Sequence, residues 1–134
     1  MSLADPVAQM NMDVKHIRNI SVICAGLMGH GIAQIFATRG YNVTMQDINN
    51  EALSKALQNI RFNLNLMVER GIGHREEIKP SIERIKTTLD LGEAASEAQF
   101  VIEAVSERFG LKQRIFQDLD SLCSSETILA TILQ

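Results

Sequence analysis

The stretch Ile20–Ala33, ISVICAGLMGHGIA, determines how the rest of the chain is interpreted. An apolar, β-branched run ends in a short turn of small residues, and a helix-like pattern begins directly after the turn. In this arrangement the free N–H groups of the helix N-terminus lie at the end of the strand, where they can bind a phosphate. The stretch therefore predicts a strand–turn–helix unit that binds a phosphate group.

Outward from this unit, strand and helix patterns alternate. The strand patterns cover 17–25, 41–47, 85–89, 100–105 and 127–133, and the helix patterns cover 27–39, 51–70, 93–98 and 111–122. Right-handed crossovers between parallel strands place helices on both faces of a sheet. The order predicts an α/β fold with a doubly wound, Rossmann-like parallel sheet, incomplete at its C-terminus. The helix after the second strand is long enough to project beyond the sheet.

Local signals predict where several elements begin and end. Gly40 is expected to end the first helix in a left-handed conformation, and Asn49 or Asn50 is expected to cap the next one. Pro80 has no backbone N–H and disfavours a helical conformation at Lys79, so we expect a turn and at most a short helix over 71–81.

Composition excludes several classes of function. The chain has 134 residues, 46% of them apolar, which suits a single domain with its own core. A net charge of -3 and the lack of a Lys/Arg cluster argue against nucleic acid and anionic membranes as partners. No apolar stretch is long enough to span a bilayer, and no signal peptide is evident, so a cytoplasmic location is expected.

The cysteines and histidines do not form a metal-binding pattern. Cys24 and Cys123 lack metal or redox spacing, and His16, His30 and His74 are scattered along the chain. We expect the histidines to face solvent or to make local hydrogen bonds, and we expect no metal.

The turn matches most of a dinucleotide-binding fingerprint. In that fingerprint one glycine forms the tight turn, a second lets the backbone approach a pyrophosphate, and a third allows close helix–strand packing. The corresponding residues here are Cys24, Gly26 and Gly29, so only the first glycine is replaced. Asp47 follows Cys24 by 23 residues, at the end of the second strand pattern, where a carboxylate accepts the ribose hydroxyls. No arginine follows it to receive a 2′-phosphate, so the pattern selects NAD.

Cys24 has two interpretations at this stage. A cysteine at a helix N-terminus can be a reactive thiolate. Alternatively, it is a tolerated small residue whose Cβ and sulfur crowd the pyrophosphate and weaken its binding.

Several stretches of the chain resemble the NAD-binding domain of the 3-hydroxyacyl-CoA dehydrogenase family, over about residues 17–131. The family opening is close to VIGAGLMGxGIAQ. The similar stretches here are VICAGLMGHGIAQ, GYNVTMQDINNEAL, VIEAVSERFGLKQRIFQDLDSLC and TILAT. The resemblance implies an oxidoreductase of the fatty-acid β-oxidation type, which oxidises the hydroxyl of a 3-hydroxyacyl-CoA to a ketone and passes hydride to NAD.

The resemblance also adds residues to the expected cofactor site. It places a glutamate and a lysine near the cofactor, at Glu107 and Lys112. Without it, Glu103 and Glu107 could be solvated carboxylates at a strand end, and Lys112 could extend along a helix surface. The expected cofactor-binding residues are Cys24, Ala25, Gly26, Leu27, Met28, Gly29, Asp47, Ala104, Val105, Glu107 and Lys112.

After TILAT the family continues with an Asn-Thr-Ser-Ser run, whereas this chain reads Ile132-Leu133-Gln134. The family's catalytic residues and helical substrate domain lie downstream of that run, so no catalytic residue is assigned. We expect a flexible tail over 1–16 and an NAD-binding domain over 17–134. This domain would bind NAD(H) without turnover and meet an acyl-CoA only in a full-length context. The alternative is a non-catalytic nucleotide-binding or oligomerisation module. A homo-oligomer is expected because the sheet edge near 127–133 is apolar.

Overall fold

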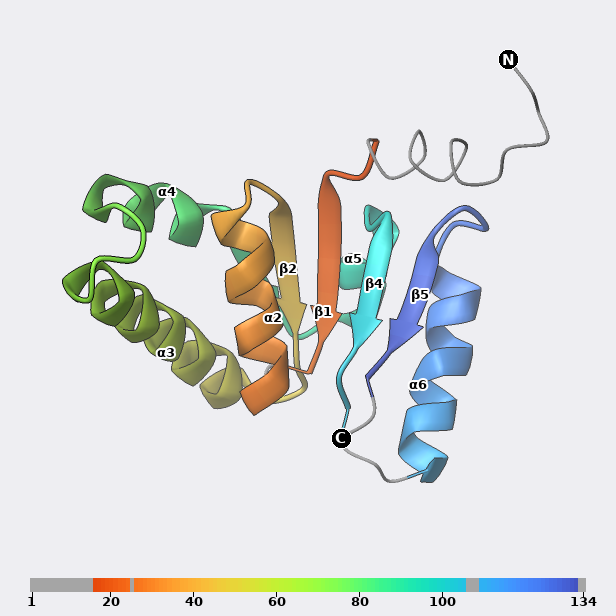
Figure 1. Ribbon diagram of the computed structural model, residues 1–134. Coiled ribbons are helices and arrows are strands. Elements are labelled where there is room, and N and C mark those ends of the chain that lie inside the picture. Colours follow the sequence, from red (N-terminus) through yellow and green to blue (C-terminus); the bar gives the residue numbers. More distant parts are fainter. Residues whose placement is uncertain (1–15, 25, 106–108, 133–134) are drawn as a thin grey trace, which may run out of the picture.

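The computed structural model describes residues 16–24, 26–105 and 109–132. These residues form a five-stranded parallel sheet with helices on both faces (Figure 1). The strands are β1 (Asn19–Ile23), β2 (Asn42–Gln46), β3 (Ile85–Thr88), β4 (Phe100–Glu103) and β5 (Ile128–Thr131), in the spatial order β3-β2-β1-β4-β5. The chain therefore builds outward from β1 in one direction and then returns to its other side. This confirms the predicted doubly wound, Rossmann-like sheet.

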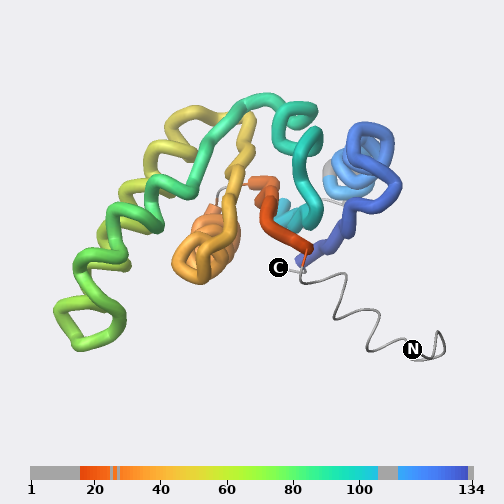
Figure 2. Tube along the Cα trace, turned by 90° about the horizontal axis from the view of Figure 1, so that it is seen from above, coloured from red at the N-terminus to blue at the C-terminus, as the bar shows by residue number. Residues whose placement is uncertain are grey.

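The helices divide between the two faces of the sheet. They are α2 (Leu27–Thr38), α3 (Asn50–Glu69), the short 3-10 helix η1 (Arg75–Glu77), α4 (Ile78–Glu83), α5 (Leu91–Ser96) and α6 (Phe109–Leu122). Figure 2 shows α2, α3 and α4 on one side and α5 and α6 on the other. The long helix α3 packs against α2 and α4 and leads away from the sheet, as predicted.

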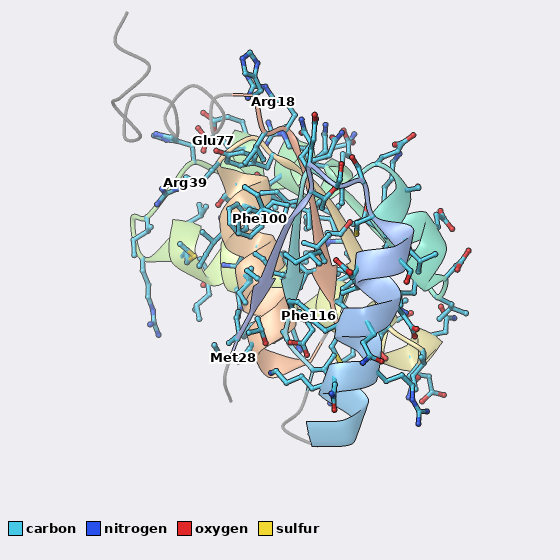
Figure 3. All side chains as sticks on the ribbon, turned by 90° about the vertical axis from the view of Figure 1, so that its right-hand side faces the viewer. Arg18, Met28, Arg39, Glu77, Phe100 and Phe116 are labelled. Atoms are coloured by element: carbon cyan, nitrogen blue, oxygen red, sulfur yellow. The ribbon has the colours of Figure 1, made fainter. Side chains whose placement is uncertain are left out.

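Each face of the sheet has its own apolar core, because successive side chains of a strand point to opposite faces. Val22 belongs to the core beneath α2 and α3, whereas the next residue, Ile23, belongs to the core beneath α5 and α6. Figure 3 shows the same division, with Phe100 on the α2 side of the sheet and Phe116 on α6. Both cores hold the central strand β1, which fixes the turn that follows it.

The predicted helix ends are largely confirmed. Gly40 has a φ of 95° directly after α2, and the Asn49 side chain accepts hydrogen bonds from the N–H groups at the start of α3. The helix predicted over 93–98 begins earlier, at Leu91, because the Asp90 side chain accepts a hydrogen bond from Gly92 N at 3.0 Å.

Short helices, η1 and α4, follow α3 as expected, but the expected bias of Lys79 away from the helical conformation is not seen. Lys79 lies in α4 although Pro80 follows it. Pro80 falls in the first turn of α4, where its missing N–H removes no hydrogen bond within that helix, and η1 leads directly into this turn.

Two further properties concern the described residues only. None of their helices combines the length and the apolarity needed to cross a membrane. They contain no group of three or more His, Cys, Asp or Glu side chains arranged to hold a metal ion.

Candidate cofactor-binding site

Hydrogen bonds link the carboxyl ends of β2, β1 and β4 at the point where the strand order reverses. Cys24 N donates to Gln46 O at the end of β2 (2.7 Å), and Ala104 N donates to Ile23 O at the end of β1 (3.0 Å). In doubly wound sheets the ligand binds in the crevice outside this reversal. The turn from β1 into α2 lies at this reversal, as the sequence predicts.

Cys24 has a backbone conformation that favours glycine. Its φ is 80°, and it is the only non-glycine residue with positive φ in the described part of the chain. An L-residue in this region costs about 1–2 kcal/mol relative to the right-handed region, because its Cβ crowds the backbone. The tight turn of the fingerprint is therefore formed although a cysteine replaces its first glycine.

Gly26 and Gly29 meet the two other requirements of the fingerprint. A Cβ added at Gly26 would meet nothing within 4 Å, so the turn presents bare backbone to open space there. A Cβ at Gly29 would lie 1.9 Å from Cys24 O, so α2 can approach the turn this closely only with glycine at that position. The turn thus has the close packing and the open backbone that a pyrophosphate requires.

The N-terminus of α2 suits an anion. Gly26 is the N-cap residue and supplies no side-chain cap, and the first turn carries no acidic side chain. The first N–H groups of a helix point outward and carry partial positive charge. Met28 lies at this end of α2 and is 45% exposed, whereas Arg18 lies at the opposite end of the sheet (Figure 3).

The histidine nearest the turn has a local hydrogen-bond partner. His30 Nδ1 lies 3.0 Å from Gly26 O within α2, which confirms the expected local contact, and His16 and His74 are exposed.

Asp47 follows β2 and borders the turn. It is half-buried, and its Oδ1 accepts a hydrogen bond from Asn49 N at 3.1 Å. Its carboxylate also forms a side-chain hydrogen bond with the Cys24 thiol. The residue predicted to bind ribose and the residue that replaces the first glycine are therefore in contact.

Burial and the neighbouring carboxylate argue against the reactive-thiolate interpretation of Cys24. Burial raises the pKa of the Cys24 thiol, and the negative charge of Asp47 and its hydrogen bond raise it further. A backbone hydrogen bond at Gly26 lowers the pKa but does not reverse the shift. The thiol is therefore protonated at neutral pH, and its effect on the site is steric and conformational.

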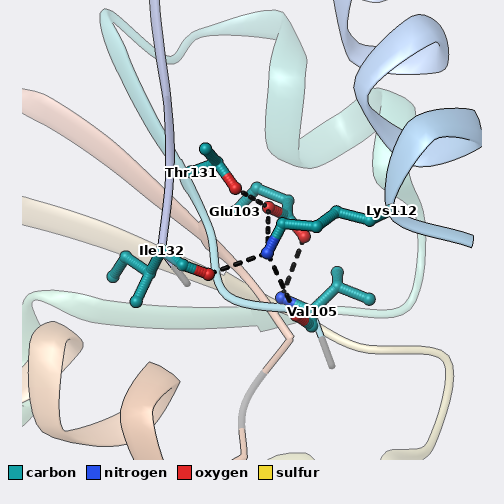
Figure 4. Close-up of polar contacts among 5 residues, drawn as sticks. All are labelled: Glu103, Val105, Lys112, Thr131 and Ile132. Atoms are coloured by element: carbon teal, nitrogen blue, oxygen red, sulfur yellow. Dashed lines mark hydrogen bonds and ion pairs between the residues drawn. The ribbon is translucent and has the colours of Figure 1, made fainter. Parts of the chain in front are cut away.

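Glu103 is not the solvated carboxylate that the residue pattern alone allowed. The end of β4 buries its side chain completely, at 0% exposure. Its Oε1 accepts from Val105 N at 3.0 Å, and its Oε2 accepts from the Thr131 hydroxyl at 2.6 Å and lies 3.3 Å from Lys112 Nζ (Figure 4). The surrounding apolar run VIEAV could have signalled this burial, but its partners lie in distant elements.

Lys112 does not extend along the surface of α6, which was the alternative to a cofactor contact. Its side chain is only 16% exposed, and Figure 4 shows it turned inward toward Glu103.

The structure describes some of the other expected site residues and not the rest. Ala104 and Val105 are buried directly after β4, and Ala104 is hydrogen-bonded to the last residue of β1. Glu107 and Ala25 lie outside the described residues, and for Leu27 the structure places the backbone, at the first position of α2. The structure therefore gathers Cys24, Gly26, Gly29, Asp47, Ala104 and Val105 at the carboxyl ends of β1, β2 and β4.

Two recesses lie at the other end of the sheet. One of about 490 Å³ is lined by Asn19 and Asn42, and one of about 720 Å³ by Gln99 and Thr127. Both open at the amino ends of the strands, away from the turn. Neither is bordered by the N-terminus of a helix as long as α2, so the chemistry favours the carboxyl end of the sheet, where α2 begins.

Comparison with known proteins gives consistent matches. Residues 19–132 match the family model described as "3-hydroxyacyl-CoA dehydrogenase, NAD binding domain". A probable 3-hydroxybutyryl-CoA dehydrogenase of Bacillus subtilis is 40% identical over 115 residues, covering 86% of this chain and 40% of that protein. A glyoxysomal fatty acid beta-oxidation multifunctional protein of Cucumis sativus is 33% identical over 125 residues, covering 93% of this chain and 17% of that protein.

Solved structures agree with these relatives. The crystal structure of 3-hydroxybutyryl-CoA dehydrogenase from Escherichia coli K12 has a TM-score of 0.82 and 36% identity, and the match covers 87% of this chain and 24% of that one. The chain thus spans less than half the length of these proteins.

Proposed function

Because the chain belongs to the 3-hydroxyacyl-CoA dehydrogenase family and matches its NAD-binding domain, we propose that the β1–α2 turn binds the pyrophosphate of NAD(H) and Asp47 the adenine ribose. The observation that carries this proposal is the pair Gly26 and Gly29. Gly26 leaves the backbone of the turn open to a ligand, and Gly29 lets α2 pack closely against the turn. Ala25, Leu27 and Met28 are proposed to complete the cofactor-binding turn and the start of α2.

The remaining site residues belong to the end of β4 and to α6. Ala104, Val105 and Glu107 are proposed to border the nicotinamide half of the cofactor, and Lys112 belongs to the same crevice. NAD, when bound, accepts a hydride. The residues of this chain bind and orient it and are assigned no proton transfer.

The activity of the whole protein is part of the same proposal. In a full-length context, the domain supports oxidation of a 3-hydroxyacyl-CoA to a 3-oxoacyl-CoA, and the acyl-CoA binds there. The 134-residue chain alone is expected to bind NAD(H) without turnover. We propose residues 17–134 as the cofactor-binding unit and residues 1–16 as a tail outside it. We propose the cytoplasm as the compartment of this unit, because its two cysteines form no disulfide.

Replacing the ribose-binding carboxylate tests the proposal. Asp47→Asn is expected to weaken NADH binding about tenfold, because hydrogen bonds to a charged acceptor are stronger than those to a neutral one. The same change should narrow the preference for NADH over NADPH, because the carboxylate no longer repels a 2′-phosphate. Fluorescence titration with both cofactors measures the two effects.

Asp118→Asn is the matched control, since Asp118 is exposed on α6. Its binding of both cofactors should equal that of the unmodified chain. Unchanged NADH affinity in Asp47→Asn would refute the assignment of Asp47.

A second candidate function is self-association, and one surface favours it. On the α2 side of the sheet, no described helix covers β4 and β5, where Phe100 and Ala130 are half-buried and Ile128 is 44% exposed. β5 is also one of the two edge strands of the described sheet. A second copy could cover this apolar surface and edge, so we propose a homo-oligomer in which the chain also serves as an assembly module.

Light scattering across a concentration series tests this second proposal. Ile128→Glu should shift the oligomer to monomer, because it places a charge in the proposed interface. Phe62→Glu is the control, because Phe62 is 66% exposed on the distant helix α3. A monodisperse monomer at every concentration would contradict the proposal.

A further inference from the structure

Gln46, the last residue of β2, links the ends of three neighbouring strands. Its backbone oxygen accepts a hydrogen bond from Cys24 N at 2.7 Å, at the start of the β1–α2 turn. Its side-chain Nε2 donates to Leu89 O, directly after β3, at 3.2 Å. The next residue, Asp47, donates its own N–H to Thr88 O at 3.2 Å. The carboxylate proposed to bind the ribose therefore follows a residue that is fixed on both sides of β2.

The side chain of Gln46 is buried and points away from α2. Met45 belongs to the core beneath α2 and α3, so the next residue along the strand points to the opposite face of the sheet. Gln46 is only 5% exposed, and a buried amide is costly unless it forms hydrogen bonds. It therefore has almost no surface with which to contact a cofactor outside the strand ends. Any effect of its amide on binding has to pass through its neighbours.

The residues that Gln46 holds after β3 are themselves anchored. The Thr88 hydroxyl donates to Glu93 Oε2 in α5 at 2.8 Å and accepts from Asp90 N at 3.1 Å. The Asp90 side chain caps the start of α5. The amide of Gln46 thus ties the end of β2 to residues that α5 holds in place.

We propose that Gln46 is a positioning residue for Asp47. Its amide fixes the end of β2 against the residues after β3, and so fixes the direction in which the chain carries the Asp47 carboxylate toward the ribose. A binding group has to be held within about 0.5 Å of its productive position, and Asp47 directly follows this anchor. The effect on cofactor binding rests on the proposed function, whereas the hydrogen bond to Leu89 O does not.

Gln46→Met in the full chain tests the role of the amide, because methionine keeps the length of the side chain and removes its hydrogen bond. NADH binding should weaken about fivefold, which corresponds to the loss of one hydrogen bond's worth of ordering at Asp47. NADPH binding should change by less than about twofold, because a displaced carboxylate also repels the 2′-phosphate less. The preference for NADH over NADPH should therefore narrow, and fluorescence titration with both cofactors measures it.

Gln99→Met is the matched control at the other end of the sheet. Gln99 Oε1 accepts hydrogen bonds from Arg18 N at 2.6 Å and from Asn19 N at 3.0 Å, so its loss also removes ties between segments. This variant should lower the melting temperature and leave the preference between the two cofactors unchanged. A purely structural effect of Gln46→Met would resemble this control.

A double-mutant cycle with Asp47→Ala shows whether Gln46 acts through Asp47. In the Asp47→Ala background, Gln46→Met should change NADH binding by less than about twofold, because the group that it positions is gone. Gln46→Leu repeats the cycle with a second apolar side chain, in case Gln46→Met does not fold.

Two kinds of failure can be distinguished. Equal losses of NADH and NADPH affinity in the Gln46 variants, or the same loss of NADH affinity with and without Asp47, would overturn the positioning role while NADH binding by the unmodified chain still supports the proposed function. Absence of NADH binding in the unmodified chain would refute the proposed function and with it the role of Gln46.

Discussion

Gly29→Ala is expected to destabilise the chain by at least about 3 kcal/mol and to abolish measurable NADH binding. The new Cβ would lie 1.9 Å from the carbonyl oxygen of Cys24, and that oxygen is backbone rather than the end of a movable side chain. Either α2 or the turn must shift, and because backbone has to move, we expect a cost at or above the upper end of the roughly 1–3 kcal/mol typical of overpacking. Denaturant unfolding followed by circular dichroism measures the loss.

Gly31→Ala provides the control within the same helix. A Cβ at Gly31 would meet nothing within 4 Å, so the substitution should stabilise α2 by up to about 1 kcal/mol through helix propensity alone. If both variants gain stability, α2 does not pack on the turn as closely as the structure shows.

Cys24→Gly is expected to be more stable than Cys24→Ala by about 1–2 kcal/mol. Both variants remove the thiol, but only glycine adopts a φ of 80° without crowding of its Cβ. The comparison between them isolates the backbone strain from the loss of the partly buried sulfur. Equal stabilities would show that position 24 is not strained.

The same substitution should strengthen NADH binding about three- to tenfold relative to the unmodified chain. Glycine removes the side chain from the turn and also releases Asp47 from its hydrogen bond with the thiol, so that the carboxylate is available to the ribose. Titration with NADH by fluorescence measures the change. Equal or weaker binding by Cys24→Gly would contradict both reasons.

Local signals made much of the fold predictable. Each strand–helix alternation is visible as a change of apolar period, and the ends of α2 and α3 are marked by Gly40 and Asn49. The cofactor turn was predictable for the same reason: its spacing of Cys24, Gly26 and Gly29 lies within six residues, and Asp47 follows at a fixed distance.

The contacts that are distant in sequence could not be predicted. Glu103 meets Thr131 across 28 residues, and only the pairing of β4 with β5 brings them together. A carboxylate at a strand end is solvated or buried according to such partners, and the chain pattern does not reveal them. The positive φ of Cys24 also depends on the turn as a whole, so the sequence indicated crowding by the side chain but not strain in the backbone.

NAD(H) is proposed to bind at the β1–α2 turn, and two-dimensional amide NMR of the full chain, titrated with NADH, shows which residues respond. We expect saturable shifts at Gly26, Met28 and Gly29, with Asp47 shifting in parallel. Shifts confined to the amino-end recess around Asn19, or no shifts at any NADH concentration, would contradict this proposal.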